Sequence, residues 1–362
     1  MKKQKILNWG WYGFENLGDD LLLNTMLKHL HGDITVPMKK KYALPNVNQV
    51  KRSYKELALG AFHYDTVIIG PGGLFPFDNK SKVLLYYLIT RLWLLRGRKV
   101  IFFGIGISEK MSSNSAILWK RMAKTANLFI PRSEKVLKRI GLSESKEIHS
   151  MADCVFASKV TSEDESIEKN RVAISVANIQ DENEKAFEDS VSKWSDVVKK
   201  LIRKGYFVDL IAFTKGADDK MVDAILSNLK NCAWGVQPIY YRNAVSAVSS
   251  WNKYKFVICM RFHSLVLSIL NGVPAVPIAY GHKTLSLAEK CGLSDYTLVW
   301  NTFQNEYYGK NINISSSQII EKVDLLCANI DSVKTKMVEN KCEPIKSASD
   351  AFAQLKLVLF QT

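Results

Sequence analysis

The chain of 362 residues lacks the features that mark disulfide-rich, metal-binding and membrane-spanning proteins. Its six cysteines are scattered without a C-x-x-C pair or a metal-ligand spacing, so we expect neither a disulfide framework nor a structural zinc site. No stretch reaches the roughly 18 uncharged apolar residues of a membrane-spanning helix. The longest candidate, residues 83–95, is shorter and contains Arg91. No charged and then apolar signal segment opens the chain, and we therefore expect a reduced, cytoplasmic protein.

Motifs for common cofactors are also missing. The first glycine-rich loop reads G-x-x-G-x-x-x-x-G instead of G-x-G-x-x-G, and the lysine run 39–41 stands where an acidic residue would be needed to hold a ribose. The chain has no lysine-containing phosphate loop, and no His, Cys, Asp and Glu cluster has metal-ligand spacing. We therefore expect no bound cofactor and no metal.

Acidic residues are scarce in the first 150 residues. That part contains 25 Lys and Arg against 11 Asp and Glu, a net charge of +14, whereas residues 151–362 contain 25 and 24, a net charge of +1. Such segregated basic charge indicates anionic partners, which include nucleic acid, anionic lipid head groups and phosphorylated ligands. Nucleic acid is disfavoured because the chain has no recognised motif and no interleaving of aromatic and basic residues along its strands.

Apolar, strand-like runs alternate with helix-like runs along both halves of the chain. Continuous apolar runs such as 66–70 and 99–107 lead into glycine loops and then helical patterns, which is typical of a parallel sheet covered on both faces. The polar, acidic stretch 158–170 is the best candidate for a linker. We predict an α/β fold of two doubly wound Rossmann-like domains that face a cleft. Its expected parts are residues 1–157, residues 171–340 and a C-terminal helix that packs back on the body, residues 341–362.

Glycine clusters follow three of the predicted strands in the first domain. They comprise Gly10, Gly13 and Gly18, then Gly70, Gly72 and Gly73, then Gly104 and Gly106. Ligands of open α/β sheets bind beyond the carboxyl ends of the strands, and glycine lets the main chain approach a ligand closely. Tight turns alone would explain any one cluster, but three clusters on one rim favour a binding surface.

Two cationic or cationisable side chains, Arg261 and His263, follow the apolar strand 255–260 and precede a helical run. The free N–H groups and positive end of a helix favour an anion at such a place. Arginine adds a planar fork for phosphate or carboxylate, and histidine adds a cation or a proton donor. The next loop offers His282 and Lys283, and Arg132 ends a first-domain strand in the same way. We therefore predict a site for a small, highly charged anion, although a solvent-exposed arginine and a satisfied helix-terminal histidine would explain either residue alone.

The ordered set of segments resembles the polysaccharide pyruvyl transferase family. The similar segments are GWYGFENLGDD, GPGGLF, FGIGIS, IPRSEKVLKRIGL, MADCVF and CMRFHSLVLSILNGVPAVPIAYGHK. Each glycine loop is weak evidence alone, whereas the Arg-x-His block followed by a Gly-Val-Pro turn and a Tyr-x-x-Lys loop is fairly specific. The resemblance spans about Ile6 to Leu293.

This resemblance implies a fold like that of the GT-B glycosyltransferases, with an acceptor-binding N-terminal domain and a donor-binding C-terminal domain. The implied donor is phosphoenolpyruvate, and the implied acceptor is a sugar in a polysaccharide or lipid-linked oligosaccharide precursor, as in exopolysaccharide or capsule synthesis. Pyruvate becomes a ketal that bridges two sugar hydroxyls. The donor-binding residues carry over onto Arg261, His263, Arg132 and Lys283, with His282 beside them. Departures are Asp20, where the family commonly has Glu, and Asn178, where an arginine is usual.

The expected mechanism begins with protonation of the donor's methylene carbon. His263 is our candidate general acid, and a phosphate-binding role is its alternative. Asp19 or Asp20 is the candidate base for the sugar hydroxyl, although capping of the following helix explains the pair equally well. Further candidate acceptor-binding residues are Gly13, Asn16, Gly72, Gly73 and Gly106. No metal is required, because cations of the protein balance the charge of the donor.

Two alternatives stay open at this point. The basic first domain and the apolar helix 83–95 suit peripheral docking on an anionic inner leaflet, although that helix also reads as a core helix. A GT-B glycosyltransferase that uses a nucleotide sugar shares the architecture, and for its acidic ribose contact only Glu289 offers itself within residues 282–293.

Overall fold

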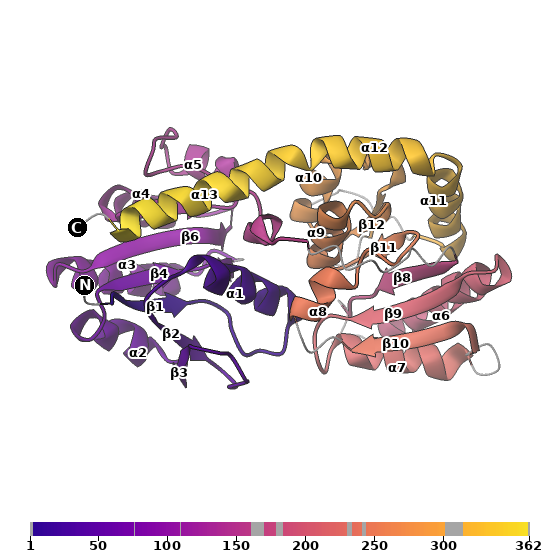
Figure 1. Ribbon diagram of the computed structural model, residues 1–362, viewed down its shortest axis with the longest axis horizontal. Helices are drawn as coiled ribbons and strands as arrows, with labels where there is room; N and C mark the ends of the chain where they lie inside the picture. The colour runs from indigo at the N-terminus through magenta and orange to yellow at the C-terminus, as the bar shows by residue number, and fades with distance from the viewer. Residues whose placement is uncertain are drawn as a thin grey trace. The chain divides into compact units, whose positions relative to one another are not determined.

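The computed structural model describes residues 3–75, 77–108, 110–160, 170–178, 184–229, 234–240, 244–300 and 314–360 (Figure 1). The chain forms two compact units. Unit 1 comprises residues 1–15, 19–158 and 343–362, and unit 2 comprises residues 16–18 and 159–342. Most of the linker predicted over 158–170 lies outside the described residues.

Unit 1 is built on a seven-stranded parallel sheet in the order β3-β2-β1-β4-β6-β5, with β7 pairing with β6. Its strands are β1 (Lys5–Trp9), β2 (Asp33–Met38), β3 (Asn48–Lys51), β4 (Thr66–Ile69), β5 (Gly72–Phe75), β6 (Lys99–Ile107) and β7 (Leu128–Pro131). Every residue of the runs TVII in β4 and VIFFGI in β6 is buried, as expected for strands covered on both faces. The last two residues of β6 are partly buried.

Helices flank the sheet of unit 1 (Figure 1). They are α1 (Leu17–His29), α2 (Tyr54–Leu59), α3 (Lys80–Leu95), α4 (Ser113–Thr125), α5 (Glu134–Arg139) and α13 (Cys342–Phe360), with 3-10 turns at Gly60–Phe62 and Cys154–Ala157. Helix α13 packs on unit 1 because the ring of Phe352 stacks on His29 at 3.9 Å and lies 4.9 Å from Phe103. The Nζ of Lys99 also donates to the carbonyl oxygen of Val358 at 2.9 Å.

Unit 2 contains a six-stranded parallel sheet in the order β10-β9-β8-β11-β12-β13. Its strands are β8 (Arg171–Ser175), β9 (Phe207–Ala212), β10 (Val236–Tyr240), β11 (Val257–Cys259), β12 (Ala275–Ala279) and β13 (Leu298–Val299). Counted from β8, this is the 3-2-1-4-5-6 order of a doubly wound sheet, and the order reverses between β8 and β11. The predicted α/β class with two parallel-sheet, Rossmann-like units is therefore confirmed.

The helices of unit 2 connect these strands. They are α6 (Glu184–Arg203), α7 (Asp218–Leu229), α8 (Ala244–Ser249), α9 (Phe262–Asn271), α10 (His282–Lys290), α11 (Ser316–Ala328) and α12 (Ile330–Asn340), with a 3-10 turn at Ser294–Tyr296. Helix α9 is hydrophobic along most of its length, since its residues from Ser264 to Leu270 are buried. It ends at Gly272, whose φ of 68° places it in the left-handed conformation that glycine adopts at helix ends. Helix α9 therefore lies inside unit 2, and its N-terminus follows the carboxyl end of β11.

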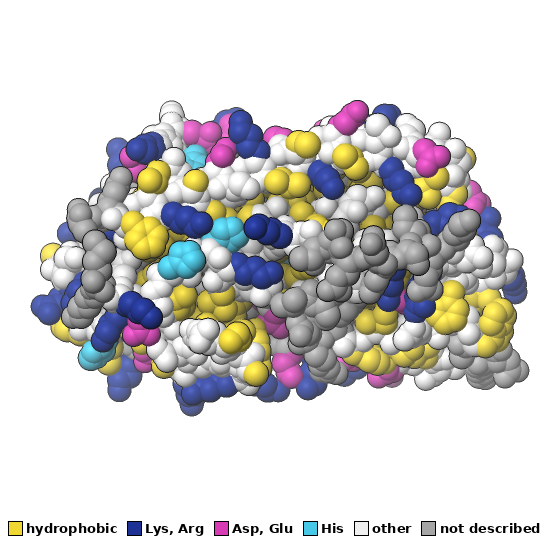
Figure 2. Space-filling model, viewed as in Figure 1, with side chains coloured by type: hydrophobic (Ala, Val, Ile, Leu, Met, Phe, Trp, Pro, Cys, Tyr) yellow, Lys and Arg dark blue, Asp and Glu magenta, His cyan; other side chains and the backbone are white. Residues whose placement is uncertain are grey.

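Basic side chains are conspicuous on unit 1. In Figure 2, Lys, Arg and His side chains gather over the face that carries α1 and α13. Lys28, His31 and Lys356 lie close enough to His29 to act on it electrostatically, and burial together with these positive charges lowers the pKa of His29. The basic excess in the first part of the sequence is thus displayed on the surface of this unit.

Candidate functional site

The first group of predicted site residues lies at the carboxyl ends of β8 and β11 in unit 2, where the strand order reverses. Ser175 ends β8, and its Oγ accepts hydrogen bonds from the backbone N–H groups of Met260 (3.2 Å) and Arg261 (3.3 Å). The Ser175 hydroxyl donates to Ser264 Oγ (2.6 Å), which donates to the carbonyl oxygen of Arg261 (2.6 Å). These bonds fix the backbone of Arg261, the N-cap residue of α9, where doubly wound sheets bind ligands.

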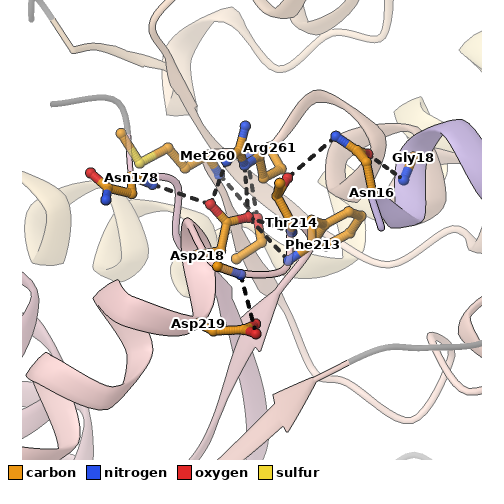
Figure 3. A network of polar contacts seen from close by, with 11 residues as sticks. Asn16, Gly18, Asn178, Phe213, Thr214, Asp218, Asp219, Met260 and Arg261 are labelled. Atoms are coloured by element: carbon orange, nitrogen blue, oxygen red, sulfur yellow. Dashed lines mark hydrogen bonds and ion pairs between the residues drawn. The ribbon is translucent and has the colours of Figure 1, made fainter. Parts of the chain in front are cut away.

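The side chain of Arg261 is paired with a buried carboxylate (Figure 3). Its Nε donates to Asp218 Oδ2 at 2.9 Å, and its Nη2 donates to Oδ1 of the same carboxylate. Burial by itself would lower the pKa of Arg261, but Tyr280 and Asp218 raise it above its ordinary value. The charge of Arg261 is therefore balanced by Asp218, and 20% of its side chain is exposed. Direct binding of an anion by Arg261 stays a prediction.

Asp218 is the residue that the sequence analysis missed. It is fully buried, and its oxygens also accept backbone N–H groups from Asn178 (3.2 Å), Phe213 (3.1 Å) and Thr214 (2.9 Å). Asn178, which departs from the family pattern, thus contributes its main chain to this network. The sequence offered no signal that separates Asp218 from Asp219, since both stand at the start of α7 and only the fold buries the first of them.

A three-residue segment from the first glycine loop, 16–18, belongs to unit 2. Asn16 Nδ2 donates to Thr214 Oγ1 at 3.3 Å, and Asn16 Oδ1 accepts the N–H of Gly18 at 2.9 Å (Figure 3). A Cβ on Gly18 would lie 2.2 Å from Nδ1 of His263, so only glycine lets the imidazole lie where it does. Both ends of the Asn16 amide are thus hydrogen-bonded within the chain, and its predicted role in acceptor binding stays a prediction.

His263 and Lys283 each lie close to the ring of Phe262. The Phe262 and His263 rings meet edge to face at 5.3 Å, and Lys283 Nζ lies 5.0 Å from the centre of the Phe262 ring. His282 and Lys283 open α10 and are exposed, while His263 lies in the first turn of α9 and is partly buried. The N-cap residues of α9 and α10, Arg261 and Gly281, form no side-chain cap hydrogen bond. Two neighbouring helix N-termini therefore point their positive ends toward the same edge of the sheet.

In unit 1, the two candidate bases differ in their surroundings. Asp20 Oδ1 accepts the hydroxyl of Tyr42 at 2.9 Å. Burial, reinforced by the negative charge of Glu15, raises the pKa of Asp20 to about 6, and the Tyr42 bond opposes this rise. Asp19 Oδ1 lies 3.8 Å from the position of a Cβ on Gly72, so its carboxylate borders the second glycine loop. At the start of α1, the Asn16 side chain accepts the N–H of Gly18 and so acts as a cap.

The predicted acceptor-binding glycines differ in how closely other atoms approach them. Gly13 has a φ of 75°, and a Cβ there would lie 2.4 Å from the carbonyl oxygen of Lys40, so it serves close packing of the main chain. A Cβ on Gly106 would lie 3.1 Å from the Cα of Gly73, which places the second and third glycine loops side by side. Among the predicted acceptor glycines, Gly73 is the one at which a Cβ would meet no atom within 4 Å, and Gly73 is exposed. Of these glycines, Gly73 presents the most open surface.

Arg132 is also paired with a buried carboxylate. Its Nη1 lies 3.1 Å from Asp153 Oδ2, and its Nε donates to the carbonyl oxygen of Gly104 at 2.9 Å. The other oxygen of Asp153 accepts the N–H of Val155 at 3.0 Å. Arg132 thus ties three segments of unit 1 together, and its role in binding the donor stays a prediction.

Metal-ligating side chains do not gather in the described parts of the chain. No group of three or more His, Cys, Asp or Glu residues there is placed to hold a metal ion. None of the described cysteines is in a disulfide, and Cys154, Cys259 and Cys291 are buried.

Comparisons with known proteins agree with this architecture. Residues 16–282 match the family model described as polysaccharide pyruvyl transferase. Among curated proteins, no sequence matches the chain significantly. Similar solved structures include a putative UDP-N-acetylglucosamine 2-epimerase from Listeria monocytogenes, with a TM-score of 0.64, 10% identity and 99% and 98% of the two chains covered. Another is Anabaena HepE in complex with UDP-glucose, with a TM-score of 0.60, 10% identity and 98% and 99% covered.

A third similar structure is S. aureus MnaA with UDP, with a TM-score of 0.61, 11% identity and 97% and 94% covered. At these identities the likeness shows the fold alone, which is the GT-B fold of glycosyltransferases and epimerases. The family match is of a different kind, because it covers most of the chain, including the Arg-x-His block and the glycine loops after the first. The chain is accordingly a transferase that belongs to the polysaccharide pyruvyl transferase family.

Proposed function

We propose that this protein transfers the enolpyruvyl group of phosphoenolpyruvate to two hydroxyls of one sugar and forms a pyruvate ketal. The observation that carries the proposal is the pair of neighbouring N-termini of α9 and α10. Their N-cap residues form no side-chain cap, and their first turns carry His263 and Lys283, each close to the ring of Phe262. Phosphoenolpyruvate places a phosphate and a carboxylate on three carbons. Two helix N-termini with an adjacent lysine and histidine suit such a compact anion.

His263 is the proposed general acid. Its proton goes to the methylene carbon of the donor, which becomes a methyl group, and positive charge develops on the neighbouring carbon. One sugar hydroxyl attacks that carbon and loses its proton. The carbon–oxygen bond to phosphate then breaks, inorganic phosphate leaves, and a second hydroxyl of the same sugar attacks and loses its proton to close the ketal ring. Lys283 and His282 would stabilise the phosphate as it departs.

Arg261 has a different role in this proposal from the one predicted. Because Asp218 balances its charge, Arg261 acts as a positioning residue that joins the β9–α7 loop to the start of α9. A guanidinium held on two sides keeps the first turn of α9, and therefore the His263 imidazole, in one place. Asn178, where an arginine is usual in the family, supplies a backbone N–H to the same carboxylate.

The acceptor is proposed to bind unit 1, where Asp20 is the candidate base. Its pKa of about 6 leaves the carboxylate mostly ionised at neutral pH, yet basic enough to accept a hydroxyl proton. Asp19 beside Gly72 is the second candidate. The proposed acceptor class is a sugar in a polysaccharide or lipid-linked precursor, and the protein would work at the cytoplasmic side of the membrane.

Peripheral contact with an anionic membrane is proposed through α3. Within the described residues, no helix combines the length and apolarity required to cross a bilayer. One face of α3 is in the core of unit 1, but Leu84, Leu88 and Leu95 are 46%, 56% and 75% exposed. Residues 80–99 contain six Lys and Arg and no acidic residue. Exposed leucines among basic side chains favour an anionic lipid surface over a neutral protein partner.

The test is phosphate release from phosphoenolpyruvate with a panel of nitrophenyl and lipid-linked sugars, paired with binding measured by thermal shift. We expect phosphoenolpyruvate to stabilise the protein and the release to require an acceptor sugar. His263→Gln should abolish release and Lys283→Met should weaken donor binding. Lys290→Met, in the last turn of α10, is the matched control and should change neither. A protein stabilised by a nucleotide sugar and indifferent to phosphoenolpyruvate would contradict the proposal.

A further inference from the structure

A second cluster of charged side chains lies in unit 1, apart from the residues discussed so far. Arg52 follows β3 directly, and its Nε donates to the carbonyl oxygen of Gly10, one residue after β1, at 3.0 Å. The carbon at the centre of its guanidinium lies 4.2 Å from the centre of the Trp9 ring and 4.9 Å from that of Trp11. The guanidinium therefore lies at the carboxyl ends of β1 and β3, where open sheets bind ligands.

Lys82 brings a second positive charge to the same place. It lies in the first turn of α3, and its Nζ is 4.9 Å from the centre of the Phe75 ring at the end of β5. Phe75 packs edge to face on Tyr86 with ring centres 4.7 Å apart, and the Tyr86 hydroxyl accepts a hydrogen bond from Nε1 of Trp9, the ring on which Arg52 lies, so the two cations flank one aromatic cluster. In agreement with this, burial and then the positive charge of Arg52 lower the pKa of Lys82. Two like charges in a half-buried place repel each other and cost stability unless an anion offsets them.

Neither cation has a carboxylate partner within the described residues. Burial lowers the pKa of Arg52, and the groups that raise it are Tyr86 and Tyr54 instead of a carboxylate. Arg132 and Arg261 differ in this respect, since each is paired with a buried aspartate. No carboxylate therefore balances the charges of Arg52 and Lys82, whereas an aspartate neutralises each of the other two arginines, Arg132 and Arg261.

An aromatic platform lies beside these cations. Trp11 and Phe14 are stacked with their ring centres 3.9 Å apart and an interplanar angle of 7°. The Arg52 guanidinium lies 5.9 Å from the Phe14 ring. Trp11 is 38% exposed, and Tyr54, whose ring is 5.9 Å from that of Trp9, is 39% exposed. The apolar C–H face of a sugar ring stacks well on exposed aromatic rings of this kind, whose one side is apolar and whose edge is wet.

We propose that Arg52, Lys82 and the Trp11–Phe14 platform form a subsite for a sugar that carries a phosphate or diphosphate group. The two cations bind the phosphate oxygens by charge-assisted hydrogen bonds, and the platform binds the sugar ring next to the phosphate. A phosphate fits better than a sugar carboxylate because its two negative charges match the two cations. The inference rests on the proposed function, for which this subsite selects acceptors that are still attached to a phosphate carrier.

A purely structural role for Arg52 explains less. Stacking on Trp9 and the bond to Gly10 would fasten the β1–α1 loop, and cation–π contacts of this type stabilise folds. That role gives no reason for placing Lys82 beside Arg52 without an acid. It also predicts that phosphates have no effect on the protein at this place.

The experiment measures binding of pyrophosphate and of hexose 1-phosphates by calorimetry, with methyl glycosides and glucuronate as comparisons. We expect the phosphates to bind at least about tenfold more tightly than the uncharged and carboxylate sugars. Lys82→Gln should weaken phosphate binding at least about tenfold. Lys80 is exposed and lies two residues earlier on α3, and Lys80→Gln should leave phosphate binding unchanged. Nucleoside diphosphate sugars and lipid-linked diphosphates form two further arms, and the tighter of them identifies the source of the phosphate.

The outcome can be separated from that of the proposed function. Phosphoenolpyruvate binding should survive Lys82→Gln and be weakened by Lys283→Met, and pyrophosphate binding should show the reverse dependence. Arg52→Lys, which keeps the charge, should retain more pyrophosphate binding than Arg52→Gln, and near-ultraviolet circular dichroism checks that both variants fold. Pyrophosphate and sugar phosphates that bind no better than methyl glycosides, or that bind equally to Lys82→Gln, would overturn the subsite. Loss of phosphoenolpyruvate binding alone would overturn only the ketal-forming function.

Discussion

The pairing of Arg261 with Asp218 decides how the most distinctive residues of this chain are interpreted. An arginine two positions before a histidine, at the end of a buried strand, suggested a cation that binds an anion directly. The structure gives that cation a fully buried carboxylate, which accepts three backbone N–H groups as well. A buried ion pair of this kind contributes little net stability, but removing one partner leaves an uncompensated charge. The ion pair is therefore best explained as a device that positions the first turn of α9.

Replacement of Asp218 by asparagine separates the two roles of Arg261. If Arg261 positions α9, Asp218→Asn should lower the free energy of unfolding by about 3–5 kcal/mol, because the guanidinium loses its carboxylate. Asp218→Asn should also bind phosphoenolpyruvate more weakly, because the first turn of α9 is no longer held in place. If Arg261 instead binds the donor directly, the same change frees a cation, and donor binding should tighten. Denaturant unfolding and calorimetric titration of Asp218→Asn measure the two quantities, and Asp219→Asn is the neighbouring control.

Asp20 makes the reaction sensitive to pH in a stated direction. Its pKa is raised to about 6 in the folded protein, so its base form is lost as the pH falls through about 6. We expect the rate of transfer to fall in that range, and Asp20→Asn to lose most of the activity. The hydrogen bond from Tyr42 lowers this pKa, so Tyr42→Phe should move the midpoint to higher pH. Tyr296→Phe in unit 2 is the control, and an unmoved midpoint in Tyr42→Phe would remove Asp20 from the mechanism.

The same shift also governs stability. A carboxylate whose folded pKa lies above its unfolded value binds its proton more strongly in the folded state. Asp20 therefore costs stability as the pH rises from about 4 to about 6, by at most about 3 kcal/mol. Asp20→Asn should accordingly be more stable than the parent protein at pH 7, and the difference should vanish below about pH 4. Urea unfolding at the two pH values measures this difference.

At the scale of elements, the two-sided character of α3 is its most informative property. Five of its residues, Val83, Tyr86, Ile89, Thr90 and Trp93, are buried, so the reading of 83–95 as a core helix holds for that face. The opposite face exposes leucines, which an ordinary surface helix would replace with polar residues. The sequence interpretations of core helix and membrane contact therefore apply to different faces of one helix, and only the contact is still a proposal.

Substitution of one exposed leucine tests the proposed membrane contact. Leu88→Glu should weaken binding to vesicles that contain phosphatidylglycerol by about tenfold, because the leucine loses its burial among lipid chains and gains a repelled charge. The matched control is Leu357→Glu on α13, where the leucine is 48% exposed. Vesicle co-sedimentation measures both. Equal binding by the parent protein to neutral phosphatidylcholine vesicles, or by both variants, would contradict a specific contact through α3.

The sequence allowed much of the fold to be predicted, because apolar strands and helix-end signals are local. The run TVII and the Asn-Gly end of α9 identify their own structure from a few residues. Ion pairs between distant segments are not local. Asp218 and Arg261 are 43 residues apart, and Arg132 and Asp153 come together only after β7 and the MAD segment have folded. The sequence therefore allowed candidate residues to be assigned to loops at strand ends, while the buried aspartates that neutralise the two arginines were missed.

At the scale of the whole molecule, the chemistry is divided between the two units. Unit 2 holds the helix N-termini of α9 and α10 with His263 and Lys283, which we propose as the donor site. Unit 1 holds Asp20, the open Gly73 and the cations Arg52 and Lys82, which we propose for the acceptor. The net charge follows the same division, since almost all of the basic excess lies in the first 150 residues. An acceptor attached to a phosphate carrier would explain the basic excess of the first 150 residues, which a donor bound to unit 2 does not explain.

This division predicts two separate patterns of hydrogen-exchange protection. Saturating phosphoenolpyruvate should slow exchange at the backbone amides that open α9 and α10, because an anion there binds the N–H groups and restrains the first turns. Pyrophosphate should slow exchange in segments 10–15 and 52–54 of unit 1, because it binds next to Arg52. Mass spectrometry of peptides from the intact protein measures both patterns, and Lys283→Met should erase the first while Lys82→Gln erases the second. If phosphoenolpyruvate protected only segments 10–15 and 52–54, the donor would bind to unit 1, and the assignment of donor and acceptor to the two units would have to be reversed.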